Sequence, residues 1–253
     1  MDWKVRLDKF LEEWEYIEDT IGILVCGSYI TGNPSSHSDL DVHIVLSDDV
    51  NYRERGNRII DGLIIEYFAN PPKQISKYFE EDYKDISPMS QTQFVTGRIL
   101  LDKTGVVQEL KNKAKEMLAS KFQEIDTNIH ELNKYAIWDM LDDLQDILEK
   151  GREDFNLIYY CNLDKLLSLY MRLIKDPYNY KSILGNITSE LTRNKYLLEE
   201  LPDKEISELI TNCITLNEPD MRLSNYELLT NKIFDLSGGF DISTFKFKGL
   251  IDN

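Results

Sequence analysis

The segment over residues 21–46 constrains the fold of this chain more than any other. It opens with a short apolar run, residues 21–26, which stops at Gly27-Ser28 and is typical of a buried strand. A loop rich in glycine, asparagine, proline and serine follows, and a second apolar run begins directly after it. Two apolar strands joined by a polar loop indicate a β-sheet in the N-terminal part of the chain.

The second of these strands places two acidic side chains next to each other. Side chains alternate between the faces of a strand, so Asp39, Asp41 and His43 share one face. The apolar residues of the other face would contact a core; they are Leu40, Val42, Ile44 and Leu46. Two neighbouring carboxylates repel each other, and a divalent cation relieves the repulsion, so the pair predicts a metal site. Two interpretations of His43 stay open, a contact near the site and a partly buried histidine with satisfied hydrogen bonds.

The charge of the chain limits the kinds of partner that it can have. Its 253 residues include 29 basic and 45 acidic side chains, which gives a net charge of −16 at pH 7. Binding to a phosphate backbone requires a basic surface, so this balance argues against nucleic acid as a main partner. An acidic surface permits cationic small molecules, although it is also common in proteins that are simply soluble.

The sequence also predicts a cytoplasmic, soluble protein without a membrane partner. Its cysteines, Cys26, Cys161 and Cys213, are far apart, as expected of buried small residues in a reducing compartment. The N-terminus is charged and amphipathic, unlike a signal peptide, and no apolar run is long enough to span a bilayer. The oligomeric state is left open.

The rest of the chain divides into a mixed half and a helical half, joined near residues 120–127. In the first half we expect strands over 62–68 and 99–101 and helices over 3–18, 73–83 and 106–117. The polar residues 50–61, with Gly56 in their middle, predict a connecting loop or a short helix. In the second half helical spacing recurs over 128–150, 154–175, 182–198, 203–216 and 222–236.

The strand expected over 62–68 carries a third acid, Glu66. Together with Gly27-Ser28 and the aspartate pair, it supplies the components of phosphoryl or nucleotidyl transfer. Glycine lets the backbone approach phosphate oxygens, and the serine hydroxyl can donate to them. Adjacent carboxylates hold magnesium ions about 3.5–4 Å apart, which bind the attacking and leaving oxygens. A third carboxylate completes the metal shell or takes the proton of the incoming hydroxyl.

This combination resembles the nucleotidyltransferase superfamily with the DNA polymerase β-like fold. The pattern reads Gly27-Ser28, then Ser38-Asp39-Leu40-Asp41-Val42-His43-Ile44-Val45, then the later acid Glu66. The matching motifs lie within residues 21–68. The length of the chain and its helical C-terminal half are most similar to the aminoglycoside (antibiotic) nucleotidyltransferases.

The resemblance implies a fold, a division into domains and a set of site residues. It implies an α+β fold, with a mixed β-sheet and flanking helices in a catalytic domain over 1–122 and an all-α helical bundle that binds the substrate over 123–253. Asp39, Asp41 and Glu66 would be the catalytic and metal-binding acids, with Glu66 either a metal ligand or the general base. Gly27, Ser28 and Ser38 would lie next to the phosphates of the nucleotide.

Two further groups of residues have both a functional and a structural interpretation. Arg53, Arg55 and Arg58 could reach the nucleotide phosphates, Arg55 being our candidate, or could belong to a solvated loop; Lys73 and Arg98 have no stronger claim. On the helix over 128–150, an acidic stripe repeats at helical spacing and consists of Asp139, Asp142, Asp143 and Asp146. It is either a solvated face or, with Tyr135 and Trp138 beside it, a surface that binds the ammonium groups of an acceptor.

The expected activity is a magnesium-dependent transfer of a nucleoside monophosphate, AMP from ATP, to a hydroxyl of a small cationic acceptor such as an aminoglycoside-type antibiotic. Pyrophosphate would be released. Two alternatives stay open: modification of a protein or a tRNA, as in antitoxin-like relatives, and a nucleotide-binding module without catalysis. Neither the acceptor nor the base of the nucleotide follows from the sequence.

Overall fold

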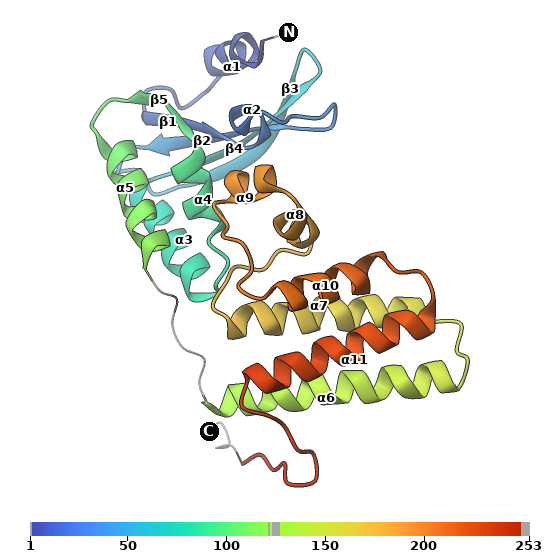
Figure 1. The fold of residues 1–253 in the computed structure, drawn as a ribbon. Helices are drawn as coiled ribbons and strands as arrows, with labels where there is room; N and C mark the ends of the chain where they lie inside the picture. Colours follow the sequence, from blue (N-terminus) through green and yellow to red (C-terminus); the bar gives the residue numbers. More distant parts are fainter. Residues whose placement is uncertain (1, 121, 123–126, 249–253) are drawn as a thin grey trace. The chain divides into compact units, whose positions relative to one another are not determined.

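The computed structural model describes residues 2–120, 122 and 127–248, and the chain forms two compact units. The first unit is Met1–Phe122 and the second is Gln123–Asn253. The first contains a β-sheet with helices, whereas the described part of the second contains helices and turns without strands (Figure 1). The expected α+β fold is confirmed.

A mixed sheet of five strands forms the centre of the first unit. In chain order the strands are β1 (Thr20–Cys26), β2 (Leu40–Leu46), β3 (Glu54–Ile60), β4 (Leu63–Asn70) and β5 (Arg98–Asp102). Their order across the sheet is β3-β4-β2-β1-β5. β2 and β4 are parallel, and the other neighbouring strands are antiparallel. β2, which carries the acidic pair, therefore lies at the centre of the sheet.

Helices cover both faces of this sheet. α1 (Trp3–Glu12) lies on one face of the sheet (Figure 1). Its Leu7 and Phe10 pack against the apolar side chains of β2 that alternate with the acids. The opposite face is covered by α3 (Pro72–Lys84), α4 (Met89–Thr96) and α5 (Val106–Ala119). A short helix, α2 (Ser28–Thr31), follows β1 directly. The residues predicted to contact a core, Leu40, Val42, Ile44 and Leu46, are fully buried.

The prediction of a loop or short helix over residues 50–61 is wrong, because most of this segment is strand β3. β3 is an edge strand that pairs antiparallel with β4 through a tight turn at Asp61-Gly62. Its side chains are exposed or only partly buried, so it lacks the apolar face by which a strand is usually recognised. Arg55 and Arg58 consequently lie on a strand and point to opposite faces of the sheet.

The described part of the second unit is a set of helices around its own core. The long helices are α6 (Thr127–Glu149), α7 (Phe155–Leu173), α10 (Lys204–Thr215) and α11 (Pro219–Leu236). Large side chains that are fully buried hold them together, among them Leu144, Tyr159, Tyr170 and Tyr226. Within the described ranges, no helix combines the length and the apolar character needed to cross a membrane.

The segment over 182–198 forms two short helices instead of one. They are α8 (Ile183–Thr188) and α9 (Glu190–Tyr196). Ser189 between them has an extended backbone, and its hydroxyl accepts a hydrogen bond from the backbone N–H of Thr192. A serine that caps a helix in this way begins a new helix and ends the preceding one, which helical spacing alone does not reveal.

Candidate active site

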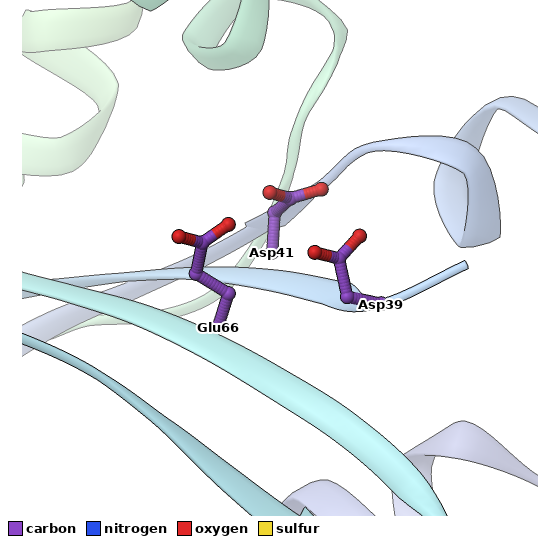
Figure 2. Close-up of side chains that lie close together, drawn as sticks. All are labelled: Asp39, Asp41 and Glu66. Atoms are coloured by element: carbon purple, nitrogen blue, oxygen red, sulfur yellow. The ribbon is translucent and has the colours of Figure 1, made fainter. Parts of the chain in front are cut away.

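Three carboxylates converge where β2 begins. Asp39 directly precedes β2, Asp41 lies on it, and Glu66 lies on the parallel neighbour β4, in register with Asp41. One carboxylate oxygen from each residue lies within 4.8 Å of the other two, and all three residues are half-buried. Figure 2 shows the three side chains extending from the same side of the sheet toward one another.

Gly27 lies directly beside the carboxylate of Asp41. Its φ of 78° lies in a region that side-chain-bearing residues rarely adopt. A Cβ atom at this position would lie 2.1 Å from Asp41 Oδ2, far inside van der Waals contact. Only glycine therefore lets the chain turn from β1 into α2 while the carboxylate of Asp41 keeps its place.

The donor atoms of this group fit a divalent cation such as Mg²⁺. Mg²⁺ prefers hard oxygen ligands, and three neighbouring carboxylates repel one another unless a cation lies among them. Burial raises the pKa of the nearby Cys26 thiol, and the charges of Asp41 and Asp39 contribute to the same rise. Among the described residues, the atoms that lie close enough together to hold a metal ion are carboxylate oxygens of Asp39, Asp41 and Glu66.

A guanidinium group contacts the third acid. Arg55 on β3 donates from Nη2 and from Nε to Oε1 of Glu66, at 2.6 and 3.2 Å. Its Cζ lies 4.8 Å from the ring centroid of Phe68, which faces Arg55 across the β3–β4 pair. Phe68 was not among the predicted site residues, although its position two residues after Glu66, on the same face of the strand, is the signal that could have identified it.

His43 is a buried histidine on β2, two residues after Asp41. Its Nε2 lies 3.2 Å from Oε1 of Gln93, and its ring contacts Phe68 at 5.1 Å and Phe94 at 4.9 Å between centroids. Burial lowers its pKa to about 4, although the hydrogen bond with Gln93 raises it. Of the two interpretations of His43, the structure supports the buried side chain with a hydrogen-bonding partner.

The loop residues that were predicted to bind the nucleotide lie close to the acids, either as sequence neighbours or through the pairing of β1 with β2. Gly27 and Ser28 form the junction between β1 and α2, next to Asp41 through the β1–β2 pair. The hydroxyl of Ser38 accepts a hydrogen bond from the backbone N–H of Ser35 at 2.9 Å, which closes the turn before β2. Ser38 thus has a structural role here, and its contact with a nucleotide stays a prediction.

The other basic side chains considered in the sequence have different surroundings. Arg53 donates to the hydroxyl of Tyr78 on α3, and Lys73 donates to the backbone carbonyl of Asp48 at 3.2 Å. Arg58 pairs with Ile65, whose side chain belongs to the face that α1 covers. Arg98 begins β5, at the other edge of the sheet. Within this group of basic residues, Arg55 is the one for which the structure records a contact with an acid of the site.

The acidic stripe lies on the solvent-exposed side of α6, opposite the buried residues of this helix. Asp139, Asp142 and Asp143 are exposed, and Asp146 forms an ion pair with Lys150 at 2.7 Å. On the same helix, Tyr135 stacks on Phe245 of the C-terminal segment, with 4.9 Å between ring centroids. That this surface binds an acceptor stays a prediction.

Comparison with protein families finds a match over the residues of this site. Residues 7–101 match the family model of the nucleotidyltransferase domain, a range that contains Gly27, Asp41 and Glu66. Among solved structures, a nucleotidyltransferase-like protein from Exiguobacterium sibiricum 255-15 is similar, with 12% sequence identity and a TM-score of 0.45. That similarity covers 94% of this chain and 77% of the other. A comparison with curated proteins found no match.

The family match and the three acids thus point to the same part of the first unit. Nucleotidyltransferase domains move nucleoside monophosphates from nucleoside triphosphates, and residues 7–101 of this chain match the model of such a domain. The match supports a nucleotidyltransferase enzyme.

Proposed function

We propose that the protein transfers a nucleoside monophosphate, AMP from ATP, to a hydroxyl of a small cationic acceptor in a magnesium-dependent reaction. The observation that supports this most is the convergence of Asp39, Asp41 and Glu66 within 4.8 Å. In this proposal residues 1–122 form the catalytic domain, and residues 123–253 form the domain that binds the acceptor. The acceptor is of the aminoglycoside type, since the chain is strongly acidic and the helix α6 presents four exposed or ion-paired aspartates.

Each group of the site has a part in this reaction. Magnesium held by the three carboxylates would stabilise the charge that develops on the attacking and leaving oxygens. Asp39, Asp41 and Glu66 would hold and orient the metal ion. Gly27 and Ser28 lie beside Asp41, where the backbone and the serine hydroxyl bind phosphate oxygens of the nucleotide.

In the chemical step, the acceptor hydroxyl attacks the α-phosphorus in line with the leaving group. A new oxygen–phosphorus bond forms, the bond to pyrophosphate breaks, and the hydroxyl proton passes to a carboxylate of the site. Arg55 is the nearest guanidinium recorded at the acids and can bind negative charge on the phosphates.

A pyrophosphate-release assay tests the proposal. The protein is incubated with Mg²⁺ and each of the four ribonucleoside triphosphates, together with a panel of aminoglycosides and lincosamides. We expect release that depends on ATP, on Mg²⁺ and on an acceptor, and its loss in Asp41→Asn. A fully active Asp41→Asn enzyme contradicts the site assignment. Labelling of a protein or tRNA without any small acceptor would indicate the macromolecular alternative, and nucleotide binding without turnover across the panel would indicate a non-catalytic module.

A further inference from the structure

The ion pair between Arg55 and Glu66 places a cation on one of the acids that would hold the metal. Both hydrogen bonds from the guanidinium end on Oε1 of Glu66, at 2.6 and 3.2 Å, so the pair does not use the two carboxylate oxygens side by side. A guanidinium that binds a carboxylate at two oxygens is held more firmly than one that binds at a single oxygen. The guanidinium thus contacts Glu66 closely, but through only one of the two carboxylate oxygens.

The two partners differ in their exposure to solvent. The side chain of Arg55 is 70% exposed, whereas that of Glu66 is 19% exposed. Exposed ion pairs are weak, because water and salt screen the attraction and two long side chains lose conformational freedom. Glu66 is therefore held in the site by its strand, and Arg55 can leave Glu66 at a small cost in free energy.

Contacts with β4 hold the strand that carries Arg55. On the other face of β3, the hydroxyl of Tyr67 donates to Oε1 of Glu54 at 2.6 Å, and Gly56 leaves room for that hydroxyl. On the face of the site, the guanidinium lies over the ring of Phe68 at 4.8 Å. An aromatic ring attracts a cation over its whole face, so the guanidinium can shift across Phe68 without losing this contact.

The charges of the site show what a divalent cation would do to this pair. Three carboxylates without a metal favour a nearby positive charge, and Arg55 supplies one. A divalent cation among the same carboxylates would repel the guanidinium, since both are positive. The triphosphate of a nucleotide would then offer Arg55 a new set of oxygen atoms.

We propose that Arg55 is an exchangeable cation of this site, which pairs with Glu66 in the metal-free protein and binds the nucleotide phosphates once a divalent cation replaces it on Glu66. This inference rests on the proposed function, since it assumes that the three acids bind a divalent cation. It makes Arg55 a positioning residue with opposite effects on two ligands. Arg55 weakens the binding of metal alone and strengthens the binding of nucleotide in the presence of metal.

The binding of Mn²⁺ to the full-length protein without nucleotide tests the first effect. Electron paramagnetic resonance counts free Mn²⁺ in titrations of the wild type and of the variants Arg55→Gln, Arg55→Lys and Arg58→Gln. Arg58→Gln removes the same charge from the same strand but from the opposite face. We expect Arg55→Gln to bind Mn²⁺ about threefold to tenfold more tightly than Arg58→Gln, because a nearby positive charge is removed from a partly screened site. Arg55→Lys keeps the charge and should resemble the wild type.

The second effect is measured by calorimetry with a non-hydrolysable ATP analogue at saturating Mg²⁺. Here Arg55→Gln should bind the analogue about fivefold or more weakly than Arg58→Gln, since it lacks a charged hydrogen-bond donor to phosphate. The inference is overturned if Arg55→Gln binds Mn²⁺ no more tightly than Arg58→Gln, or if its affinity for the analogue is unchanged. Failure of the proposed function looks different, since the wild type itself would then bind no Mn²⁺ or Asp41→Asn would bind it equally well.

Discussion

Asp41 on β2 and Glu66 on β4 are direct partners across a parallel pair of strands, so two negative charges face each other at the centre of the sheet. Asp39 adds a third, with its carboxylate within 4.8 Å of both. Like charges at paired strand positions destabilise a sheet. The fold keeps this arrangement beside a well-packed core, which is understandable if the site binds a cation during function.

The first prediction is that Asp41→Asn stabilises the metal-free protein while it removes metal binding. The substitution keeps the shape of the side chain but removes one of three neighbouring charges. We expect the free energy of unfolding in EDTA to rise by about 0.2–1 kcal/mol. Urea unfolding measures it, and the exposed Asp8→Asn on α1 is the matched control. Mg²⁺ should stabilise the wild type and not the Asp41→Asn variant, whereas a less stable Asp41→Asn protein in EDTA would contradict the repulsion.

The second prediction concerns Gly27, which shapes the metal site from the side of β1. In Gly27→Ala the new Cβ would lie 2.1 Å from Asp41 Oδ2, so the carboxylate must leave its present position beside Asp39 and Glu66. The positive φ of 78° adds backbone strain, and we expect a loss of about 1–3 kcal/mol in stability. Titration with Mn²⁺ should show greatly weakened binding.

Gly32→Ala is the control for strain at a glycine. Gly32 also has a positive φ, of 90°, but no atom lies within 4 Å of a Cβ built there. This variant should lose stability and keep its affinity for Mn²⁺. If both variants bind Mn²⁺ like the wild type, the close approach of Gly27 to Asp41 does not shape the site.

The acids of the site could be predicted from the sequence, because they depend on a short-range rule. Alternation along one strand places Asp39 and Asp41 on the same face, and apolar neighbours mark the other face as buried. Glu66 lies near them only because of the order of the strands in the sheet. The resemblance to a known family predicted that arrangement, whereas the spacing of residues could not. The parallel pairing of β2 with β4 is what brings Glu66 into register with Asp41.

Strand β3 and the contact of its Arg55 with Glu66 were missed for a physical reason. An edge strand with polar side chains on both faces buries little, so its sequence lacks the apolar alternation that identifies a strand. The signal that was present is Asp61-Gly62, a pair typical of tight hairpin turns, located between residues 50–60 and the strand with Glu66. With that hairpin in view, Arg55 would have been placed beside Glu66 and Arg58 on the other face.

The third prediction tests the packing that holds β3 in place. A Cβ at Gly56 would lie 2.5 Å from the hydroxyl oxygen of Tyr67, which donates to Glu54. Gly56→Ala should therefore lower the free energy of unfolding by about 1–3 kcal/mol. In a Tyr67→Phe background the hydroxyl is absent, so the same substitution should cost less, although part of the cost should remain because the ring atom Cζ lies 2.8 Å from the new Cβ. Urea unfolding of the four proteins of this cycle measures the difference. An equal cost in both backgrounds would show that the hydroxyl is not what excludes a side chain at this position.

The last prediction concerns the dependence of stability on pH, and it lies in the second unit. Burial and, to a smaller extent, the negative charge of Glu199 together raise the pKa of Asp176 from 3.8 to about 6. Between pH 3.8 and 6 the folded state therefore binds more protons than the unfolded state, so the free energy of unfolding falls as the pH rises through this window. Asp176→Asn has no charge to bury. It should exceed the wild type in stability by about 1–2 kcal/mol at pH 7.5, a value reduced for the partial exposure of the group.

Urea unfolding of both proteins at pH 7.5, 5 and 3.5 measures this difference, which should become small at the lowest pH because the carboxyl is then largely protonated in both states. Glu199→Gln removes the smaller of the two causes. It should stabilise the protein at pH 7.5 by less than Asp176→Asn does, and it should add little in the double variant, since Asp176 no longer carries the charge that Glu199 repels. A difference between Asp176→Asn and the wild type that is the same at all three pH values would mean that it arises from packing and not from the buried charge.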